Sequence, residues 1–334
     1  MLVSWNTTNM CNLACAHCYR DAGQKADAEL TTAEGRRLID EIAAAGFKVM
    51  IFSGGEPLMR PDIYELIAHA AERGLRPVLG SNGTMITEKV ARRLVESGAR
   101  AVGISLDSVD PAAHDRFRAE QGSWQAAVDG MKNCRAAGLP FQLHTTVMDW
   151  NYEEVEQLTD LAVELGCMAH HVFFLVPTGR GADIERTTLR AVQYERLLRR
   201  LLKKQQSTGL EIKPTCAPQF IRVADQLGVK TRFQRGCLAG IAYCLINPVG
   251  DLQACAYLDE MVGNVRETSF GKLWREAKLF RDLRSRRYSG HCGACDYRDT
   301  CGGCRARAKF YYGDYMAEEP WCLYRRGKTE HATR

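Results

Sequence analysis

The sequence lacks the long apolar runs that membrane-spanning segments require. No stretch of its 334 residues approaches the roughly 20 consecutive apolar residues that cross a bilayer as a helix. Residues 1–6 show no basic region followed by an apolar stretch, so no secretory signal is expected. We therefore expect a cytoplasmic protein without a membrane partner. Internal repeats and low-complexity tracts are also missing, so nothing indicates a repeat protein.

An excess of charge of one sign is missing as well. The 45 Lys and Arg residues stand against 40 Asp and Glu residues, and the formal charge of +5 is spread along the chain. This balance gives no case for a nucleic-acid partner. Charged residues make up 25% of the chain, which is the usual share of a globular protein, so a mostly disordered chain is excluded. The length predicts two domains, or one barrel with an appendage.

The abundant residue is cysteine, with 14 in the chain. Because no secretory signal is expected, metal binding explains these cysteines better than disulfides do. Three lie near the start, eight lie in the last third, and three stand elsewhere. In chain order they are Cys11, Cys15, Cys18, Cys134, Cys167, Cys216, Cys237, Cys244, Cys255, Cys292, Cys295, Cys301, Cys304 and Cys322.

Residues 1 to about 180 alternate short apolar runs with amphipathic stretches. Strands are predicted at 2–7, 47–52, 77–79, 101–105, 141–147 and 170–176. Helices are predicted at 31–46, 62–73, 87–98, 123–138 and 152–165, with Thr31, Thr87 and Ser123 as N-caps. Units in this order predict a parallel sheet with right-handed crossovers. Six are too few for a closed eight-stranded barrel. We expect an α/β fold with a partial (β/α)6 barrel and ligands at the carboxyl ends of its strands.

The pattern changes after residue 186. A basic amphipathic helix is predicted from Thr188 to Leu202, and we interpret residues 187–230 as a helical bridge. Residues 231–334 have short strands, frequent glycine and crowded cysteines. This extension is too poor in apolar runs to fold on a core of its own, so we expect metal to hold it. The predicted domains are therefore 1–186, 187–230 and 231–334.

The first three cysteines follow the first predicted strand with the spacing C-x3-C-x2-C. Three thiolates on one loop can bind three irons of a four-iron cluster and leave the fourth iron open. An open position is what catalytic metal sites keep for a substrate or cofactor. The alternative is a zinc site that His17 or a distant residue completes.

With His17 as its aromatic residue, the motif C-x3-C-x-aromatic-C resembles that of the radical S-adenosylmethionine (SAM) superfamily. The resemblance covers residues 1 to about 180 and includes the run Ser53-Gly54-Gly55-Glu56-Pro57, similar to the family motif that holds the methionine amino group of SAM. Glycine lets the backbone approach a ligand, and Glu56 offers a carboxylate to an ammonium.

The resemblance implies further SAM contacts at the ends of later strands. These are Asn82 in a turn after the third strand, Ser105 and Asp107 beside the ribose, Val176 beside the adenine, and His144, Thr145 or Thr146 at the fifth strand. It also implies a reaction, in which a reduced cluster donates one electron to SAM and a 5′-deoxyadenosyl radical then abstracts hydrogen from a substrate. An electron donor such as flavodoxin or ferredoxin is the implied partner.

The later cysteines resemble the SPASM extension of radical SAM enzymes, which carries two auxiliary [4Fe–4S] clusters. Transfer by position assigns one cluster to Cys237, Cys244, Cys255 and Cys304. The other is assigned to Cys292, Cys295, Cys301 and Cys322. Family members often have three residues between the last two cysteines of the central run, whereas this chain has two. A shorter layout with one cluster and zinc knuckles are the alternatives.

Three cysteines lie outside these sets. Cys134 and Cys167 fall on predicted helix or helix-end positions and are expected to be small buried residues. Cys216 stands in an irregular segment just before the extension. A structural thiol is its ordinary interpretation, and a substrate-facing catalytic thiol or a replacement cluster ligand are the alternatives.

Residues 4–23, 263–267 and 301–322 resemble enzymes of modified-haem synthesis. That group includes a haem d1 enzyme and an enzyme that removes acetate side chains from didecarboxysirohaem. The short segment before Cys11 resembles the latter more, so we expect the conversion of didecarboxysirohaem, a tetrapyrrole, to iron-coproporphyrin. Arg20, Arg118, Arg180 and Arg186 are candidate partners of its carboxylates, and solvated surface arginines are their ordinary interpretation.

Three alternatives to this substrate stay open. One is a haem d1 enzyme that removes propionate side chains. Another is a SPASM maturase that modifies peptides. Such maturases often carry an N-terminal recognition domain, which we do not expect in a chain that starts at the barrel. The last is a zinc-stabilised binding protein without catalysis.

Overall fold

The computed structural model describes residues 1–325. Ten strands in this part of the chain form one sheet in the order β10-β9-β8-β1-β2-β3-β4-β5-β6-β7. The strands are β1 (Leu2–Asn6), β2 (Val49–Ser53), β3 (Arg76–Ser81), β4 (Ala101–Ser105), β5 (Phe141–Val147), β6 (Ala169–Phe174), β7 (Glu211–Thr215), β8 (Tyr243–Ile246), β9 (Asp251–Gln253) and β10 (Met261–Asn264). From β8 to β7 all neighbours are parallel, whereas β9 and β10 are antiparallel to theirs. The six predicted strands are confirmed as the consecutive parallel strands β1 to β6.

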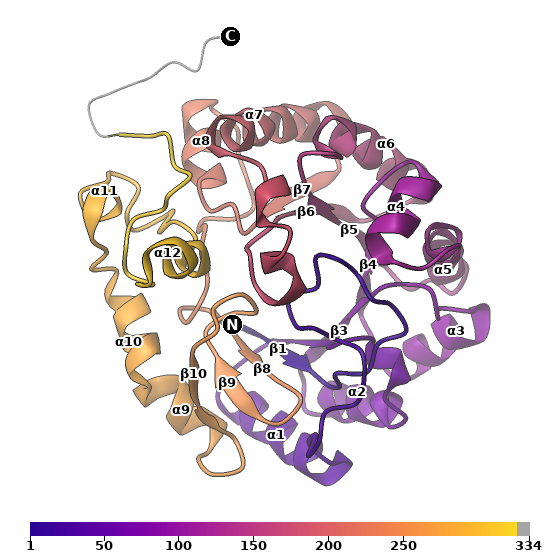
Figure 1. Cartoon of the computed structure of the whole chain (residues 1–334). Coiled ribbons are helices and arrows are strands. Elements are labelled where there is room, and N and C mark those ends of the chain that lie inside the picture. The colour runs from indigo at the N-terminus through magenta and orange to yellow at the C-terminus, as the bar shows by residue number, and fades with distance from the viewer. Residues whose placement is uncertain (326–334) are drawn as a thin grey trace.

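Helices surround this sheet, and Figure 1 shows most of them along the rim of the molecule with the strands inside. The helices are α1 (Thr32–Ala44), α2 (Ile63–Glu72), α3 (Glu88–Glu96), α4 (Pro111–Arg118), α5 (Ser123–Ala136), α6 (Val155–Leu165), α7 (Ala191–Thr208), α8 (Phe220–Gln226), α9 (Phe270–Glu276), α10 (Lys278–Ser285), α11 (Gly290–Gly293) and α12 (Arg305–Tyr312). Short 3-10 turns are η1 (Pro57–Met59), η2 (Tyr152–Glu154), η3 (Gly179–Ala182) and η4 (Glu185–Thr187). Among these described helices none has the length and apolar character that crossing a membrane requires.

The predicted helix caps are confirmed at two places and wrong at one. Thr31 forms the capping box of α1 with Glu34, and the hydroxyl of Thr87 accepts a hydrogen bond from the amide of Val90 in α3. Ser123 is not the cap of α5, because it is the first residue of that helix. The carboxylate of Asp115 in α4 instead accepts hydrogen bonds from the first turn of α5, so a side chain distant in sequence does the capping.

The bridging helix begins and ends later than predicted. The sequence predicts a helix from Thr188 to Leu202, but α7 covers Ala191–Thr208. The hydroxyl of Thr188, which directly follows η4, donates to the carbonyl of Glu185, the first residue of η4, so the chain enters α7 only afterwards. Gly209 ends α7 in the left-handed conformation, with φ 70°.

The extension shares the core of the barrel, so it does not depend on a core of its own, and its stabilisation by metal stays a prediction. Strand β8 pairs with β1, placing Ile246 beside Trp5. The ring of Phe47 packs against both Phe270 and Trp274 of α9, at 5.1 Å between ring centroids in each case. One sheet thus runs through all three predicted segments, and their division into domains stays a prediction.

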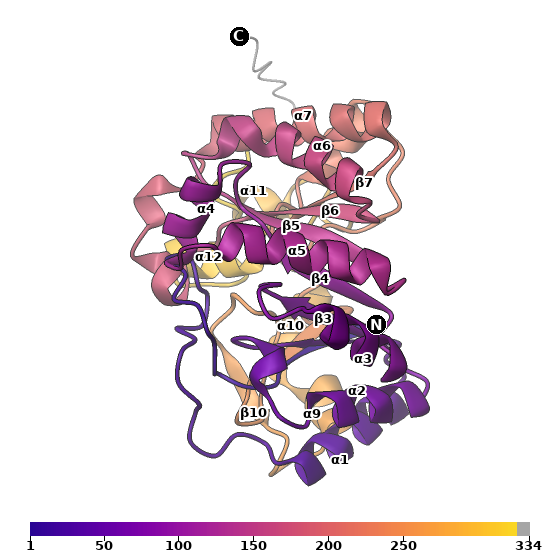
Figure 2. The same cartoon turned by 90° about the vertical axis from the view of Figure 1, so that its right-hand side faces the viewer.

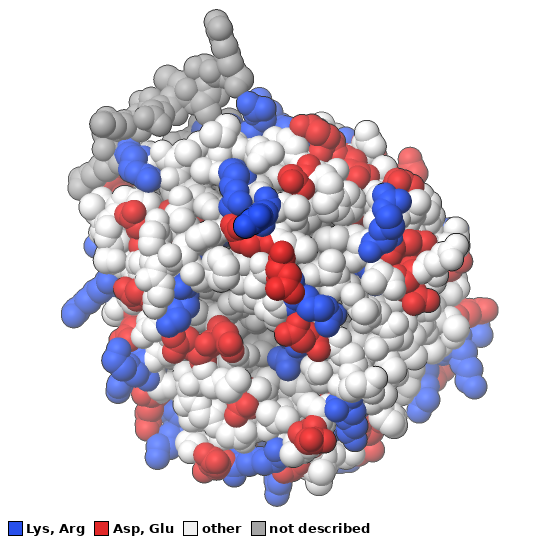
Figure 3. All heavy atoms as spheres, viewed as in Figure 1, with Lys and Arg blue, Asp and Glu red and all other residues white. Residues whose placement is uncertain are grey.

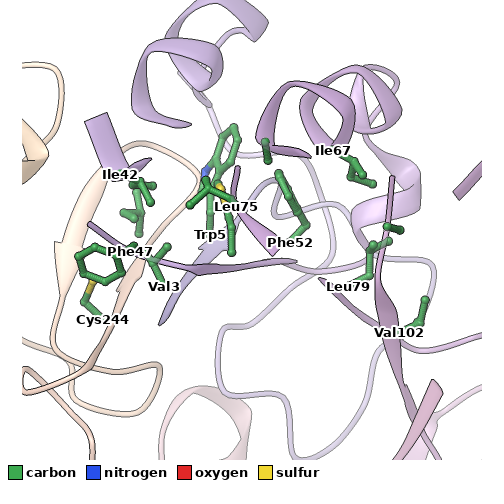
Figure 4. Close-up of a cluster of buried hydrophobic side chains, with 14 of the residues drawn as sticks. Val3, Trp5, Ile42, Phe47, Phe52, Ile67, Leu75, Leu79, Val102 and Cys244 are labelled. Carbon is green, nitrogen blue, oxygen red and sulfur yellow. The ribbon is translucent and has the colours of Figure 1, made fainter. Parts of the chain in front are cut away.

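The core lies between the strands and the outer helices. Figure 4 shows ten of its residues labelled: Val3, Trp5, Ile42, Phe47, Phe52, Ile67, Leu75, Leu79, Val102 and Cys244. Figure 2 shows the loop after β1 together with α4 and α12 at one end of the barrel, and the N-terminus of the chain at the opposite end. The end with the loop is where the parallel strands finish, so the cysteines of that loop and part of the extension meet there.

Candidate functional site

The loop after β1 carries Cys11, Cys15 and Cys18. The amide of Cys11 donates to the carbonyl of Gly23 (2.9 Å), and the amide of Cys18 donates to the carbonyl of Cys15 (3.2 Å). Burial raises the pKa of the Cys11 thiol to about 11, and the charges of Cys15 and Cys18 add to this rise because they lie nearby. Buried thiolates that repel one another need a positive charge, which a metal cluster supplies. The structure thus brings the three predicted ligands together.

Arg118 links this loop to Asp107. Its Nε donates to Oδ2 of Asp107 (2.7 Å), and its Nη1 lies 3.7 Å from Sγ of Cys15. Both side chains are buried. Burial raises the pKa of Asp107, but the attraction of Arg118 outweighs this, so the pKa is lowered overall. The pair therefore holds a carboxylate and a guanidinium, both charged, between the cysteine loop and the end of β4.

His17, the aromatic residue of the cysteine motif, stacks on Phe117. The ring centroids are 4.2 Å apart and the planes differ by 13°. Burial lowers the pKa of His17 to about 3, so its imidazole is neutral at pH 7. A flat, neutral ring at this position packs the cysteine loop against α4.

The turn after β2 holds the Gly-Gly-Glu-Pro run against the cysteine loop. A Cβ at Gly54 would lie 2.4 Å from the carbonyl oxygen of Thr8, and one at Gly55 would lie 2.2 Å from that of Met10, so only glycine allows this approach. The carboxylate of Glu56 is buried and accepts hydrogen bonds from the hydroxyl of Ser81 and the amide of Asn82. Burial raises its pKa to about 7.

Glu56 therefore orders the protein around the expected SAM site. Its carboxylate also accepts a hydrogen bond from the amide of Leu58 (3.2 Å), directly after Pro57. The sequence suggests this carboxylate as a partner for an ammonium, but in the structure it joins the turn after β2 to the end of β3. The side chain of Asn82 then donates to Oδ1 of Asn12 (2.8 Å), which ties the end of β3 to the cysteine loop.

The remaining predicted SAM contacts lie at the ends of β4, β5 and β6. Ser105 is half-buried as the last residue of β4, and Val176 is buried just after β6. At β5, the hydroxyl of Thr145 donates to the carbonyl of Leu106 (2.7 Å), and the amide of Thr146 donates to Oδ1 of Asp107 (2.8 Å). Thr145 is fully buried, so it is the least suited of the three β5 candidates to meet a ligand.

The protein at this end of the barrel fits SAM. Asn6 Nδ2, Arg20 Nε and Arg180 Nη2 are buried donors without a hydrogen-bond partner among residues 1–325. Native proteins leave few such groups unpaired, so these donors call for a bound group with acceptor atoms. The carboxylate and the hydroxyl groups of SAM have that character.

The four arginines proposed as carboxylate partners are used in different ways. Arg118 pairs with Asp107, and Arg180 donates to the carbonyls of Cys15 (2.9 Å) and Ala22 (3.1 Å). Arg20 is half-buried in the cysteine loop, and Arg186 is exposed. Arg118 and Arg180 thus hold the cysteine loop.

Four thiols gather where the extension meets the barrel: Cys216, Cys237, Cys255 and Cys304. Burial is the main cause of the raised pKa of Cys216, and the charges of the other three add to it. Cys216 adopts a left-handed backbone with φ 58°, which is uncommon for a residue with a side chain. Its carbonyl accepts a hydrogen bond from Nη2 of Arg307 (3.1 Å), which fixes this conformation.

Cys244 lies apart from this group, contrary to the transfer by position. It stands on β8, is fully buried, and points among Val3, Ile42 and Phe47, as Figure 4 shows. Because side chains alternate along a strand, Cys244 shares the core-facing side of β8 with Ile246. The predicted set contains Cys244 and not Cys216, whereas Cys216 is the thiol that lies near Cys237, Cys255 and Cys304.

Four further thiols line one cavity in the extension. They are Cys292, Cys295, Cys301 and Cys322, the set assigned to the second auxiliary cluster. The amide of Glu319 donates to Sγ of Cys292 (3.3 Å), and that of Tyr297 donates to Sγ of Cys295 (3.4 Å). Amides that donate to sulfur stabilise thiolates, so the surroundings fit a cluster.

Cys134 and Cys167 are buried, and burial raises the pKa of each thiol to about 12, as inert structural cysteines require. Within residues 1–325 no three His, Cys, Asp or Glu side chains are arranged to hold a single metal ion. A four-iron cluster spaces its thiolates more widely than a single ion does, because each thiolate binds a different iron.

Two residues of the site, Arg307 and Glu319, have no predicted role, although both lie in the run 301–322 that resembles modified-haem enzymes. Glu319 Oε2 accepts a hydrogen bond from the amide of Cys304 (2.6 Å) and its Oε1 lies 3.2 Å from Nη1 of Arg307. The one sequence signal for Glu319 is its position three residues before Cys322.

Comparisons with known proteins agree with this geometry. The profile of the radical SAM superfamily matches residues 5–162, and that of the SPASM iron-sulfur cluster-binding domain matches residues 237–304. The chain is also similar in fold to a solved structure, native anSMEcpe with bound AdoMet, with a TM-score of 0.74 at 17% identity over 96% of this chain and 93% of that one.

Curated relatives extend over nearly the whole chain. The AdoMet-dependent heme synthase of Methanosarcina barkeri is 40% identical over 98% of this chain and 97% of its own. The Fe-coproporphyrin III synthase of the same organism is 31% identical over 96% and 87%, and the mycofactocin maturase MftC of Mycobacterium ulcerans is 34% identical over 93% and 84%. The chain therefore belongs to the radical SAM superfamily, as an enzyme with a SPASM extension that uses SAM and [4Fe–4S] clusters.

Proposed function

We propose that this enzyme acts on an iron tetrapyrrole and that its product is haem. The observation that carries this proposal is the 40% identity to an AdoMet-dependent heme synthase, which extends over 98% of this chain and includes both cysteine-rich ends. The substrate is then iron-coproporphyrin III, because haem differs from it by two vinyl groups in place of two propionates.

The conversion of one propionate side chain to a vinyl group removes a hydrogen atom, CO2 and one electron from that side chain. SAM held on a reduced cluster supplies the radical that takes the hydrogen. The electron left on the side chain needs an acceptor, a role that clusters bound by the cysteines of the extension would fill. The physiological donor, a flavodoxin or ferredoxin, stays a prediction.

We assign the SAM-binding cluster to Cys11, Cys15 and Cys18. The first auxiliary cluster falls to Cys216, Cys237, Cys255 and Cys304, and the second to Cys292, Cys295, Cys301 and Cys322. Gly54, Gly55, Glu56, Pro57, Asn82, Ser105, Asp107 and Val176 form the SAM site in this proposal. The assignment of these residues rests on their position, since all of them lie at the end of the barrel that carries the cysteine loop.

A second candidate is the removal of acetate side chains from didecarboxysirohaem to give iron-coproporphyrin. The relative named Fe-coproporphyrin III synthase favours it, at 31% identity. Propionate removal in haem d1 synthesis and peptide modification are weaker candidates. The 34% identity to a mycofactocin maturase supports peptide modification. That match covers less of both chains than the match to the AdoMet-dependent heme synthase does.

The test is an anaerobic turnover assay with SAM and dithionite. Iron-coproporphyrin III and didecarboxysirohaem are supplied separately, and 5′-deoxyadenosine and the tetrapyrrole products are measured by mass spectrometry. We expect haem from iron-coproporphyrin III and no product with Cys15→Ala. Loss of acetate groups from didecarboxysirohaem, with iron-coproporphyrin III unchanged, would establish the second candidate instead.

A further inference from the structure

Three residues on neighbouring strands form one wall of the barrel interior. In the register of the sheet, His144 on β5 faces His171 on β6, which faces Lys213 on β7. All three are half-buried, whereas Thr145 and Val172 next to them are fully buried. Side chains on a strand alternate between its faces, so the buried neighbours face the helices and these three face the interior.

His170 confirms this orientation from the opposite face. Its Nδ1 lies 2.9 Å from the hydroxyl of Thr159 on the outer helix α6, and its Nε2 lies 2.9 Å from that of Thr145. Because His170 points to the helices, the next residue, His171, points to the interior. The two adjacent histidines thus have different surroundings, and His170 provides a matched control for His171.

The imidazoles of His144 and His171 stack, with centroids 5.1 Å apart and planes 11° apart. A Cβ at Gly103 on β4 would lie 2.1 Å from Cε1 of His144, so the ring occupies the space that this glycine leaves. Nε2 of His144 lies 3.2 Å from Oε1 of Gln142. His171 makes no hydrogen bond through its ring in the described part of the chain, so its nitrogens are free for a ligand.

Burial lowers the pKa values of both imidazoles, that of His144 to about 4, and they are therefore neutral at pH 7. A neutral imidazole keeps a lone pair and binds haem iron in many proteins. It would be a poor partner for a carboxylate. The adjacent cation is Lys213, which forms no ion pair within residues 1–325 and whose Nζ lies 3.1 Å from the ring centroid of Phe233.

The wall lies directly beside the expected SAM site, deeper in the barrel. His144 pairs with Ser105 at the end of β4, and Thr146, two residues further along β5, donates its amide to Asp107. Two residues of a strand span about 7 Å. A substrate held by this wall would thus lie next to SAM.

We propose that this wall binds the substrate macrocycle, with His171 as a ligand of its iron and Lys213 as the partner of one of its carboxylates. The proposal rests on the proposed function, since it takes an iron tetrapyrrole as the substrate. His144 is a positioning residue that keeps the imidazole of His171 in its stacked orientation. On the face shown in Figure 3, acidic and basic side chains are interspersed without a large area of one sign, so that surface offers no rival site for several carboxylates.

The test measures binding without turnover. Ferric iron-coproporphyrin III is added to the anaerobic holoenzyme without SAM, and its optical difference spectrum and EPR signal are recorded. We expect imidazole-ligated iron in the wild type. In His171→Ala we expect loss of that signature, at least tenfold weaker binding, and recovery of the signature on adding free imidazole. His170→Gln should retain the wild-type signature.

Metal-free coproporphyrin separates iron ligation from folding. Its binding, followed by fluorescence, should be equal in the wild type and His171→Ala, because it has no iron, and weaker in Lys213→Met. An iron spectrum in His171→Ala identical to the wild type, in an enzyme that still forms haem, would overturn the ligand assignment alone. Absence of any tetrapyrrole binding by the wild type would overturn the proposed function as well.

Discussion

Arg307 and Glu319 form an ion pair from which water is excluded, with 3.2 Å between Nη1 and Oε1. Arg307 also holds the carbonyl of Cys216, and Glu319 holds the amide of Cys304. The amide of Glu319 donates to Sγ of Cys292 as well. This pair therefore joins the thiols of both proposed auxiliary clusters.

Removing Glu319 should cost the protein both stability and a cluster. In Glu319→Ala the guanidinium of Arg307 stays buried without its partner, a change that destabilises proteins by about 3–5 kcal/mol. Anaerobic urea unfolding and iron analysis measure the two effects. The control is Glu65→Ala, which breaks the exposed pair of Glu65 with Arg36 and should cost at most about 1 kcal/mol. Equal effects of the two variants would contradict a special role for the buried pair.

Cys216 and Cys244 should differ when each is replaced by alanine. Cys216→Ala removes a proposed ligand, so anaerobically prepared protein should lose about four irons per chain if its cluster cannot form with three thiolates. Cys244→Ala removes one buried sulfur atom from the core, which should lower stability by about 1 kcal/mol with the iron content unchanged. The reverse pattern would restore Cys244 to the cluster.

Cys295→Ala tests the second auxiliary cluster. Iron and acid-labile sulfide should both fall from about twelve atoms per chain to about eight, since one of three four-iron clusters is lost. The cavity then keeps three thiols, Cys292, Cys301 and Cys322, and no other cysteine among the described residues lines it to replace the fourth. Stoichiometric zinc in the wild-type protein, with iron for only one cluster, would show that the extension binds zinc.

The contact of Arg118 with Cys15 should matter for SAM cleavage. Arg118→Met leaves Asp107 charged and buried without its partner and removes a positive charge beside the cluster. We expect 5′-deoxyadenosine formation to fall at least tenfold and the EPR signal of the reduced cluster to change on adding SAM less than in the wild type. Arg118→Lys keeps the charge and should retain more activity than Arg118→Met. Equal activity of both variants and the wild type would disprove this role.

Lys213 should make tetrapyrrole binding depend on pH. Burial lowers its pKa to about 8, against the opposing effect of Glu211 on the same strand, and His171 on β6 is the neutral neighbour. The charged form, which binds a carboxylate, predominates below that pKa. Affinity for metal-free coproporphyrin should therefore fall about tenfold as the pH rises from 7 to 9. In Lys213→Arg the affinity should stay constant over this range, and a parallel fall in that variant would exclude Lys213 as the cause.

Much of the fold could be predicted from sequence because its signals are local. The capping box of Thr31 and Glu34 and the apolar periodicity of the strands involve residues within a few positions of one another. The helix α4 has no comparable periodic pattern, so the sequence does not predict it. The site motifs were equally local, since Cys11, Cys15 and Cys18 share one loop and Gly54 to Pro57 form one turn.

The sequence by itself thus determined the partial barrel, the first cluster loop and the chemistry of its ligands. Only the tertiary structure places Cys216, and not Cys244, beside Cys237, Cys255 and Cys304, because this depends on which face of β8 packs on the core. The same holds for His170 and His171, adjacent in sequence but on opposite faces of β6. The physical reason is the alternation of side chains along a strand, since the face that turns toward the helices is set by packing against distant residues such as Thr159.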